Sequence, residues 1–151
     1  MPNSDSAPVF HLIYRSKSCM PKADTEKGLS EIFSKARRNN KAAGITGALM
    51  NHEDRFAQVL EGPEPEVRSL FERIKGDKRH EAVEIRKQGI VPERAFERWA
   101  MAEVLDQGDV DLPMLATAKG LAEAAPWKVT QEQKHVLAEL RLLTRGYGKG
   151  S

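Results

Sequence analysis

Apolar and polar side chains alternate along two stretches of the chain, residues 9–18 and residues 55–61. A period of two is typical of a strand that buries one face. In the first strand, the residues that share the expected buried face are Phe10, Leu12, Tyr14 and Ser16. In the second strand, they are Phe56, Gln58 and Leu60. The alternation therefore places a phenol and a carboxamide, those of Tyr14 and Gln58, among large apolar side chains.

A carboxamide in such surroundings needs hydrogen-bond partners. Each buried polar group that is left unpaired costs about 1–3 kcal/mol. A phenol has one O–H donor, and a carboxamide offers an acceptor at one end and two donors at the other. We therefore expect Gln58 to bond to Tyr14 on one side and to the ring of a bound ligand on the other.

Two further stretches repeat their apolar residues at spacings of 0, 3, 4 and 7, which is typical of a helix with one buried face. The first helix is expected to begin at Asp24 or Thr25, either of which can cap it, and to end near Asn39 and Asn40. Its apolar residues are Leu29, Ile32, Phe33 and Ala36. The second helix is expected between Pro63 and Gly76, and its apolar residues are Val67, Leu70, Phe71 and Ile74.

Three more strands are expected at residues 44–51, 82–91 and 95–104. The resulting order, βαββαββ, predicts an α+β ferredoxin-like sandwich. Its core is a five-stranded mixed sheet with two helices on one face.

The composition changes after residue 105, and we divide the chain there. Residues 1–8 are expected to form a disordered N-terminus, residues 9–105 the sandwich domain and residues 106–151 a C-terminal helical extension. Two segments of the extension, 112–125 and 130–145, have a helical pattern. They either cover the free face of the sheet or mediate self-association.

The composition is that of an ordinary water-soluble domain. The 151 residues are 40% hydrophobic and 30% charged, and 24 Lys and Arg against 22 Asp and Glu leave a net charge of +2. This balance favours neither nucleic acid nor a membrane surface as a partner. Cys19 has no cysteine to pair with, which suggests a reducing cytoplasm. The four histidines lack ligand spacing, so we expect no metal site.

Five segments follow one another in an order that resembles a known family. They are YRS at 14–16, ARRNNKAAGITGAL at 36–49, FAQVLEGP at 56–63, DKRH at 77–80 and ERAFERWAM at 93–101. Each alone is a weak pattern, but together they resemble a BLUF domain, a blue-light sensor that holds FAD non-covalently between two helices. The resemblance covers roughly residues 9–104.

The resemblance implies a photochemical role for the polar pair. Tyr14 would donate an electron to the excited flavin, with proton movement through Gln58. The amide would then adopt a new orientation or tautomer, and its changed hydrogen bonds would shift the flavin absorption reversibly to the red. Because this cycle turns over no substrate, the chain is not expected to be an enzyme.

The resemblance also implies roles for other residues, each of which periodicity alone would explain as core packing or a helix end. The expected cofactor-binding residues are Ile32, Asn39, Asn40, Gln58, Ile74, Arg79 and His80. The expected signal-relay residues are Ser16, Trp99 and Met101, the last two on a strand beside the one that carries Tyr14.

We thus predict a short cytoplasmic photoreceptor without a linked effector domain. It would bind flavin, form a homo-oligomer and signal in trans to an unknown partner protein, and it would contact neither nucleic acid nor a membrane. Two alternatives stay open. One is a ferredoxin-like acyl-phosphate hydrolase, for which Arg15, Arg37 and Asn40 supply the residue types. The other is a ligand-free interaction module whose tail helices pair with a partner.

Overall fold

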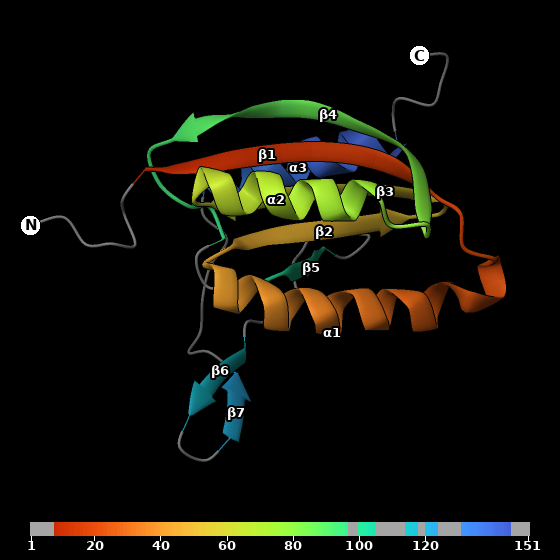
Figure 1. Cartoon of the computed structure of the whole chain (residues 1–151), viewed down its shortest axis with the longest axis horizontal. Coiled ribbons are helices and arrows are strands. Elements are labelled where there is room, and N and C mark those ends of the chain that lie inside the picture. The colour runs from red at the N-terminus through yellow and green to blue at the C-terminus, as the bar shows by residue number, and fades with distance from the viewer. Residues whose placement is uncertain (1–7, 97–99, 105–113, 118–119, 124–130, 146–151) are drawn as a thin grey trace, which may run out of the picture.

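The computed structural model describes residues 8–96, 100–104, 114–117, 120–123 and 131–145. Its central sheet has the strand order β4-β1-β3-β2-β5 (Figure 1). These strands are β1 (Val9–Ser18), β2 (Thr46–His52), β3 (Arg55–Gly62), β4 (His80–Val91) and β5 (Ala102–Val104). The helices of the domain are α1 (Thr25–Ala43), which follows a 3-10 turn at Lys22–Asp24, and α2 (Glu64–Lys75). The predicted βαββαββ order is confirmed.

The strand pairing brings the two polar residues of the sequence pattern side by side. β1 runs antiparallel to both β3 and β4, and Tyr14 lies directly opposite Gln58 in the β1–β3 register. β2 pairs antiparallel with β3 and parallel with β5, so the sheet is mixed. Because opposite residues point to the same face, the phenol and the carboxamide share one side of the sheet.

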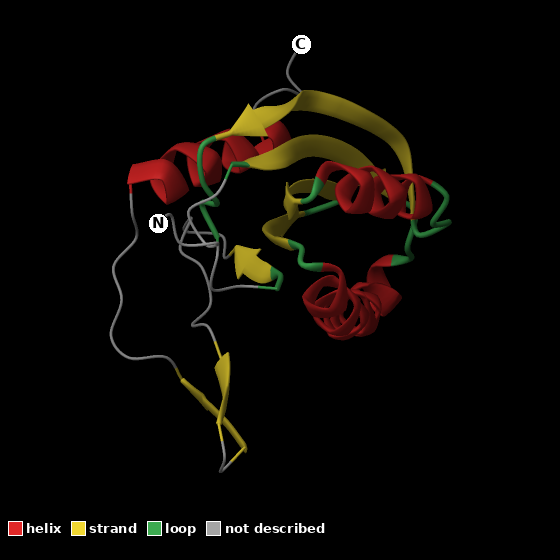
Figure 2. Ribbon diagram, turned by 60° about the vertical axis from the view of Figure 1, so that its left-hand side comes forward, coloured by secondary structure: helices red, strands yellow, loops and turns green. Residues whose placement is uncertain are grey.

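The sheet has a hydrophobic core on each of its faces. α1 and α2 cover one face, where Phe33 and Phe71 pack in a cluster with Tyr14 and Leu60. A third helix, α3 (Gln131–Arg145), covers the other face, where Leu137 and Leu140 pack among residues of β1, β2 and β3 (Figure 2). Of the two roles left open for segment 130–145, this helix takes the first, covering the free face.

Two expected boundaries were wrong. α1 continues to Ala43, past the expected end at the two asparagines, because Gly44 adopts a left-handed conformation (φ 74°) and caps the helix there. Asn40 is consequently buried in the last helical turn. β5 spans three residues and not ten, because the backbone N–H groups of Ala95 and Phe96 bond to a side chain of β3 and not to a neighbouring strand.

Two other expectations also differ from the structure. β5 lies beside β2, so the strand after Met101 is not a neighbour of the one that carries Tyr14. Segment 112–125 was expected to be helical, but β6 (Met114–Thr117) and β7 (Gly120–Glu123) form an antiparallel pair there. Gly120 would lie inside that helix, at a cost of about 1 kcal/mol relative to alanine.

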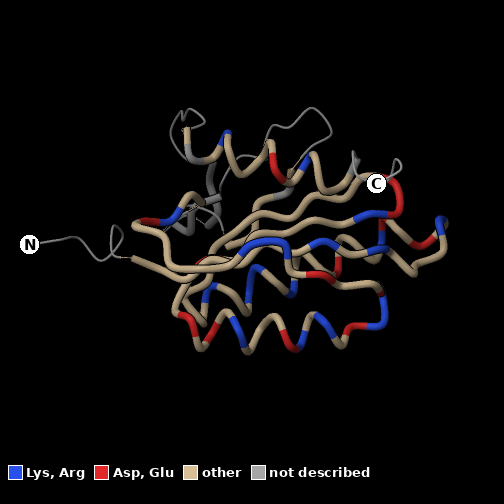
Figure 3. Tube along the Cα trace, turned by 90° about the horizontal axis from the view of Figure 1, so that it is seen from above, with Lys and Arg blue, Asp and Glu red and all other residues tan. Residues whose placement is uncertain are grey.

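Some predicted features lie outside the described residues. They are Trp99 and, apart from Pro8, the N-terminal segment 1–8. Acidic and basic residues are interspersed along α2, whereas in α1 the acidic residues come before position 32 and all the charged residues after it are basic (Figure 3). No described helix is long and apolar enough to cross a bilayer.

Candidate functional site

A pocket of about 160 Å³ lies between α1, α2 and the sheet. Its walls come from β1, α1, β2, β3, α2 and the connection that leads from α2 into β4. The predicted photoactive and cofactor-binding residues all line it: Tyr14, Ile32, Asn39, Asn40, Gln58, Ile74, Arg79 and His80. The fold thus brings to one place residues that are spread over about 65 positions of the sequence.

The floor of the pocket holds a buried chain of polar contacts. The Tyr14 hydroxyl donates to Gln58 Oε1, and Gln58 Nε2 donates to Met101 Sδ at 3.3 Å. Tyr14, Gln58 and Met101 are 3%, 4% and 1% exposed. Burial raises the pKa of the Tyr14 phenol far above its usual range, and the negative charge of Asp77 adds to this shift. The phenol is therefore neutral and acts as the donor.

The amide of Gln58 has donor capacity to spare. Within the described part of the chain its Nε2 has only a thioether sulfur as partner, and a thioether is a weak acceptor. Because Gln58 also lines the pocket, a ligand carbonyl in the pocket would satisfy this N–H group. The donor set therefore fits a ring with carbonyl oxygens on its edge, such as a flavin.

Apolar side chains from facing helices form the sides of the pocket. Ile32 comes from α1 and Ile74 from α2, and both are partly buried against the same hydrophobic cluster. Burying a flat ring between such groups gains about 25 cal/mol for each Å² of apolar surface. Asn39 is exposed beside them. Asn40 is 1% exposed, and its Nδ2 donates to the carbonyl of Ala100 at 2.9 Å.

Charged residues line the more exposed part of the pocket. Arg79 binds Asp77 through Nε and Nη2, with a shortest distance of 2.7 Å, and this hydrogen bonding lowers the pKa of the Asp77 carboxyl. Lys35 and Arg73 also line the pocket, and neither forms an ion pair with any of the described residues. Sequence reasoning missed both, although Lys35 lies one helical turn after Ile32 and Arg73 one turn after Leu70.

His80 lines the pocket, but both of its ring nitrogens already have protein partners. Nε2 lies 2.6 Å from the carbonyl oxygen of Ile74, and Nδ1 lies 2.8 Å from Ser16 Oγ. Since a carbonyl can only accept, a neutral ring donates from Nε2 and accepts at Nδ1. His80 thereby links the end of α2 to β1.

The remaining candidate residues lie elsewhere. Ser16 does not line the pocket and reaches it only through His80. Arg15 pairs with Glu84 at 2.7 Å, and Arg37 donates to the carbonyl of Met101 at 3.0 Å; neither lines the pocket. The arginine and asparagine set of the hydrolase alternative is therefore not assembled around it.

Comparison with known proteins gives a consistent result. The BLUF family model, described as sensors of blue-light using FAD, matches residues 9–102. A photoactivated adenylate cyclase subunit beta from Euglena longa is 30% identical over 101 residues, which are 67% of this chain and 12% of that protein. The blue light- and temperature-regulated antirepressor BluF of Escherichia coli (strain K12) is 38% identical over 69 residues, 46% of this chain and 17% of that protein.

Solved structures show the same similarity. The photo-activated state of BlsA superimposes with a TM-score of 0.62 at 33% identity, over 64% of this chain and 69% of that one. The dark state of BlrB, a BLUF protein, superimposes with a TM-score of 0.61 at 30% identity, over 65% and 73%. By contrast, the chain spans about an eighth of the length of the cyclase subunit.

Proposed function

This chain belongs to the BLUF family of blue-light sensors, which bind flavin, and from that membership we propose that it senses blue light with FAD held non-covalently between α1 and α2. The observation that carries the proposal is the buried pair of Tyr14 and Gln58 at the floor of the pocket. An oxidisable phenol there is hydrogen-bonded to an amide that still has a donor to offer. BLUF domains are sensor modules and not themselves enzymes.

When bound, FAD supplies blue-light absorption and an excited state that oxidises strongly. Tyr14 is the electron donor in this proposal. Because its phenol is neutral, loss of an electron makes the phenolic proton strongly acidic, and the acceptor already in place for that proton is Gln58 Oε1. The electron and the proton both return to Tyr14, so the cycle leaves the residue chemically unchanged and consumes no substrate.

In this proposal, the amide of Gln58 is the group whose hydrogen bonding differs between the dark state and the light-induced state. Its oxygen now faces Tyr14 and its nitrogen faces Met101. A new orientation or tautomer of the amide changes donors and acceptors at both ends at once, so the contacts to Tyr14, to Met101 and to the ligand change together. Met101 repacks at small cost because its side chain is unbranched and flexible.

The choice of FAD rests on the description of the family, and the charged part of the pocket supports a phosphorylated flavin in general. Lys35 and Arg73 bring two positive charges from facing helices to a pocket whose one described carboxylate, Asp77, is already paired with Arg79. Phosphate oxygens would compensate those charges. The guanidinium group of Arg79 adds a third positive charge to the lining of the pocket. This arrangement favours a phosphorylated flavin, FAD or FMN, over riboflavin.

The output is proposed to act in trans on a partner protein. The curated relatives share this domain, yet their names give different activities, an adenylate cyclase and an antirepressor. The activity therefore belongs to what the domain controls and not to the domain itself. We place this protein in the cytoplasm as a homo-oligomer, with residues 106–151 as the part that communicates with the partner.

The test is an absorption spectrum of the FAD-loaded protein before and after blue light. The protein should show a red shift that reverses in the dark, and Gln58→Leu should bind FAD without that shift. Gln88→Leu is the matched control, because Gln88 lies on β4 away from the pocket and should cycle normally. A normal red shift in Gln58→Leu would contradict the assigned role.

A further inference from the structure

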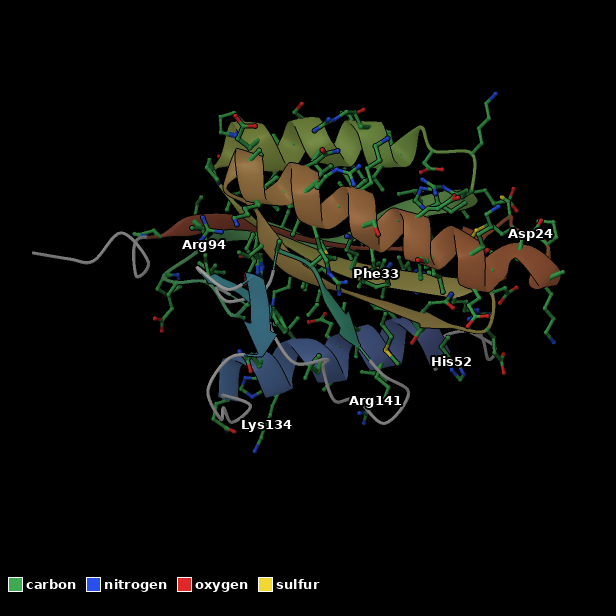
Figure 4. The ribbon with its side chains drawn as sticks, turned by 90° about the horizontal axis from the view of Figure 1, so that it is seen from below. Asp24, Phe33, His52, Arg94, Lys134 and Arg141 are labelled. Atoms are coloured by element: carbon green, nitrogen blue, oxygen red, sulfur yellow. The ribbon has the colours of Figure 1, made fainter. Side chains whose placement is uncertain are left out.

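A buried carboxylate that the proposed photochemistry does not use lies at one end of β3. Glu61 is 1% exposed, and its carboxylate accepts three hydrogen bonds. The backbone N–H groups of Ala95 and Phe96 donate at 2.5 and 3.0 Å, and Thr46 Oγ1 donates at 2.9 Å. Arg94 lies at the same end of the sheet (Figure 4) and donates to Thr46 Oγ1 and to the carbonyl of Glu61.

Side chains of α3 also contact Ala95 and Phe96. Gln133 Nε2 donates to the carbonyl of Ala95 at 2.8 Å, and Gln133 is 7% exposed. Phe96 is fully buried in the cluster that contains Leu137 and Leu140 of α3. Side chains of β3 and α3 therefore satisfy both backbone polar groups of Ala95, a residue outside any strand or helix.

Five positions further along, a second set of side chains holds the chain on the pocket side. Asn40 donates to the carbonyl of Ala100 at 2.9 Å, and Arg37 donates to the carbonyl of Met101 at 3.0 Å. Met101 belongs to the hydrophobic cluster beneath α1 and α2, and its sulfur accepts from Gln58. Of the connection from β4 to β5, Phe96 thus lies in the hydrophobic cluster beneath α3, and Met101 lies in the cluster beneath α1 and α2, beside the pocket.

We infer that Glu61 and Gln133 are positioning residues for the photocycle: by fixing Ala95 and Phe96 they set how Met101 meets Gln58, so that α3 tunes the lifetime of the light-induced state. This inference rests on the proposed function. Coupling free energies between two sites are reciprocal. If the state of Gln58 biases this connection, then the contacts of α3 with the connection bias the equilibrium between the two Gln58 states by the same free energy. A variant that changes the free energy of the light-induced state relative to the barrier for its decay then changes the rate of thermal return.

The test compares dark-recovery rates of FAD-loaded variants after a blue-light pulse. Gln133→Leu removes the donor to Ala95 while keeping a similar volume. Its recovery rate should change by about two- to thirtyfold, the range for substitutions along a coupling path. The dissociation constant for FAD should stay unchanged, because Gln133 does not line the pocket. Glu61→Gln, which keeps one acceptor oxygen, should alter the rate in the same direction.

Two control variants separate positioning from simple stability. Gln131→Leu makes the same substitution at an exposed residue of α3 and should recover at the wild-type rate. Thr144→Val removes a buried hydroxyl from the other end of α3, where it bonds to the carbonyl of Leu140, and should lower the urea midpoint without changing recovery. If Gln133→Leu recovers like Gln131→Leu, the inference is overturned while the photoreceptor function stands. If the wild-type protein shows no red shift, the proposed function itself fails.

Discussion

The hydrogen bond between Tyr14 and Gln58 predicts a specific pattern of stabilities in a double-mutant cycle. Gln58→Leu leaves the buried Tyr14 hydroxyl without its acceptor, and Tyr14→Phe leaves Gln58 Oε1 without its donor. Each single change should lower the free energy of unfolding by about 1–3 kcal/mol, the cost of one unsatisfied buried group. The double variant removes both polar partners and puts apolar groups in their place, which is nearly neutral in such sites.

The cycle therefore predicts a coupling energy of about 2–6 kcal/mol, because a nearly neutral double variant is compared with the sum of two single losses of about 1–3 kcal/mol each. The assay is urea unfolding of the flavin-free proteins, followed by circular dichroism and extrapolated to water. Omitting flavin keeps changes in cofactor affinity out of the comparison. The slope of the unfolding free energy with urea should be the same for all four proteins, because the same surface is exposed on unfolding.

Additive costs would refute this reasoning. If the double variant loses the sum of the two single losses to within about 0.5 kcal/mol, the residues do not interact and the buried contact is absent in solution. FAD-loaded samples of the same four proteins give an independent check. Only the wild type should show the red shift, since both single changes remove a group that the proposed switch requires.

Three further predictions concern the pocket and its support. Lys35→Ala combined with Arg73→Ala should weaken the binding of FAD and FMN but not of riboflavin, as measured by fluorescence titration. Raised salt should likewise weaken the binding of FAD and FMN to the wild type. Equal losses of affinity for all three flavins would argue against a phosphate-binding role of the two residues. Gly47→Ala should lower the free energy of unfolding in urea by about 3 kcal/mol or more, because the new Cβ would lie 2.0 Å from the carbonyl oxygen of Val59. Gly76→Ala is the control and should be close to neutral, because its new Cβ would have no atom nearer than 3.7 Å. Asp77 has a lowered pKa, mainly through its hydrogen bonds to Arg79, so it contributes stability above the unfolded-state pKa and loses it as the pH falls through the folded value. Asp77→Asn should therefore flatten the decline of the melting temperature below about pH 4, and an unchanged decline would contradict this.

Much of the fold follows from local sequence patterns. The strand at residues 9–18 was predicted with the bounds that β1 has, because alternation and the flanking polar residues are local signals. The same alternation predicted that Tyr14 and Gln58 share a buried face, and the β1–β3 register confirms it. α2 likewise has a clear spacing of apolar residues, with acidic residues in its first turn and Gly76 at its end.

The differences arise where distant residues decide the local structure. The segment before β5 has an apolar pattern that predicts a strand, but the carboxylate of Glu61, more than thirty positions away, takes the N–H groups that a strand would use. The engagement of both His80 nitrogens depends on Ser16 and on the end of α2, which no pattern around His80 reveals. Lys35 and Arg73 also stand apart in the sequence, and only the facing of α1 and α2 brings them to one pocket.

The central claim is that a light-driven rearrangement of Gln58, hydrogen-bonded to Tyr14, occurs around a bound flavin. The most direct measurement is the light-minus-dark absorption difference of the purified protein after addition of FAD. The purified protein should be yellow, and its flavin band should move to longer wavelength under blue light and return in darkness. A protein that takes up no flavin, or one that holds flavin with an unchanged band under illumination, would contradict it.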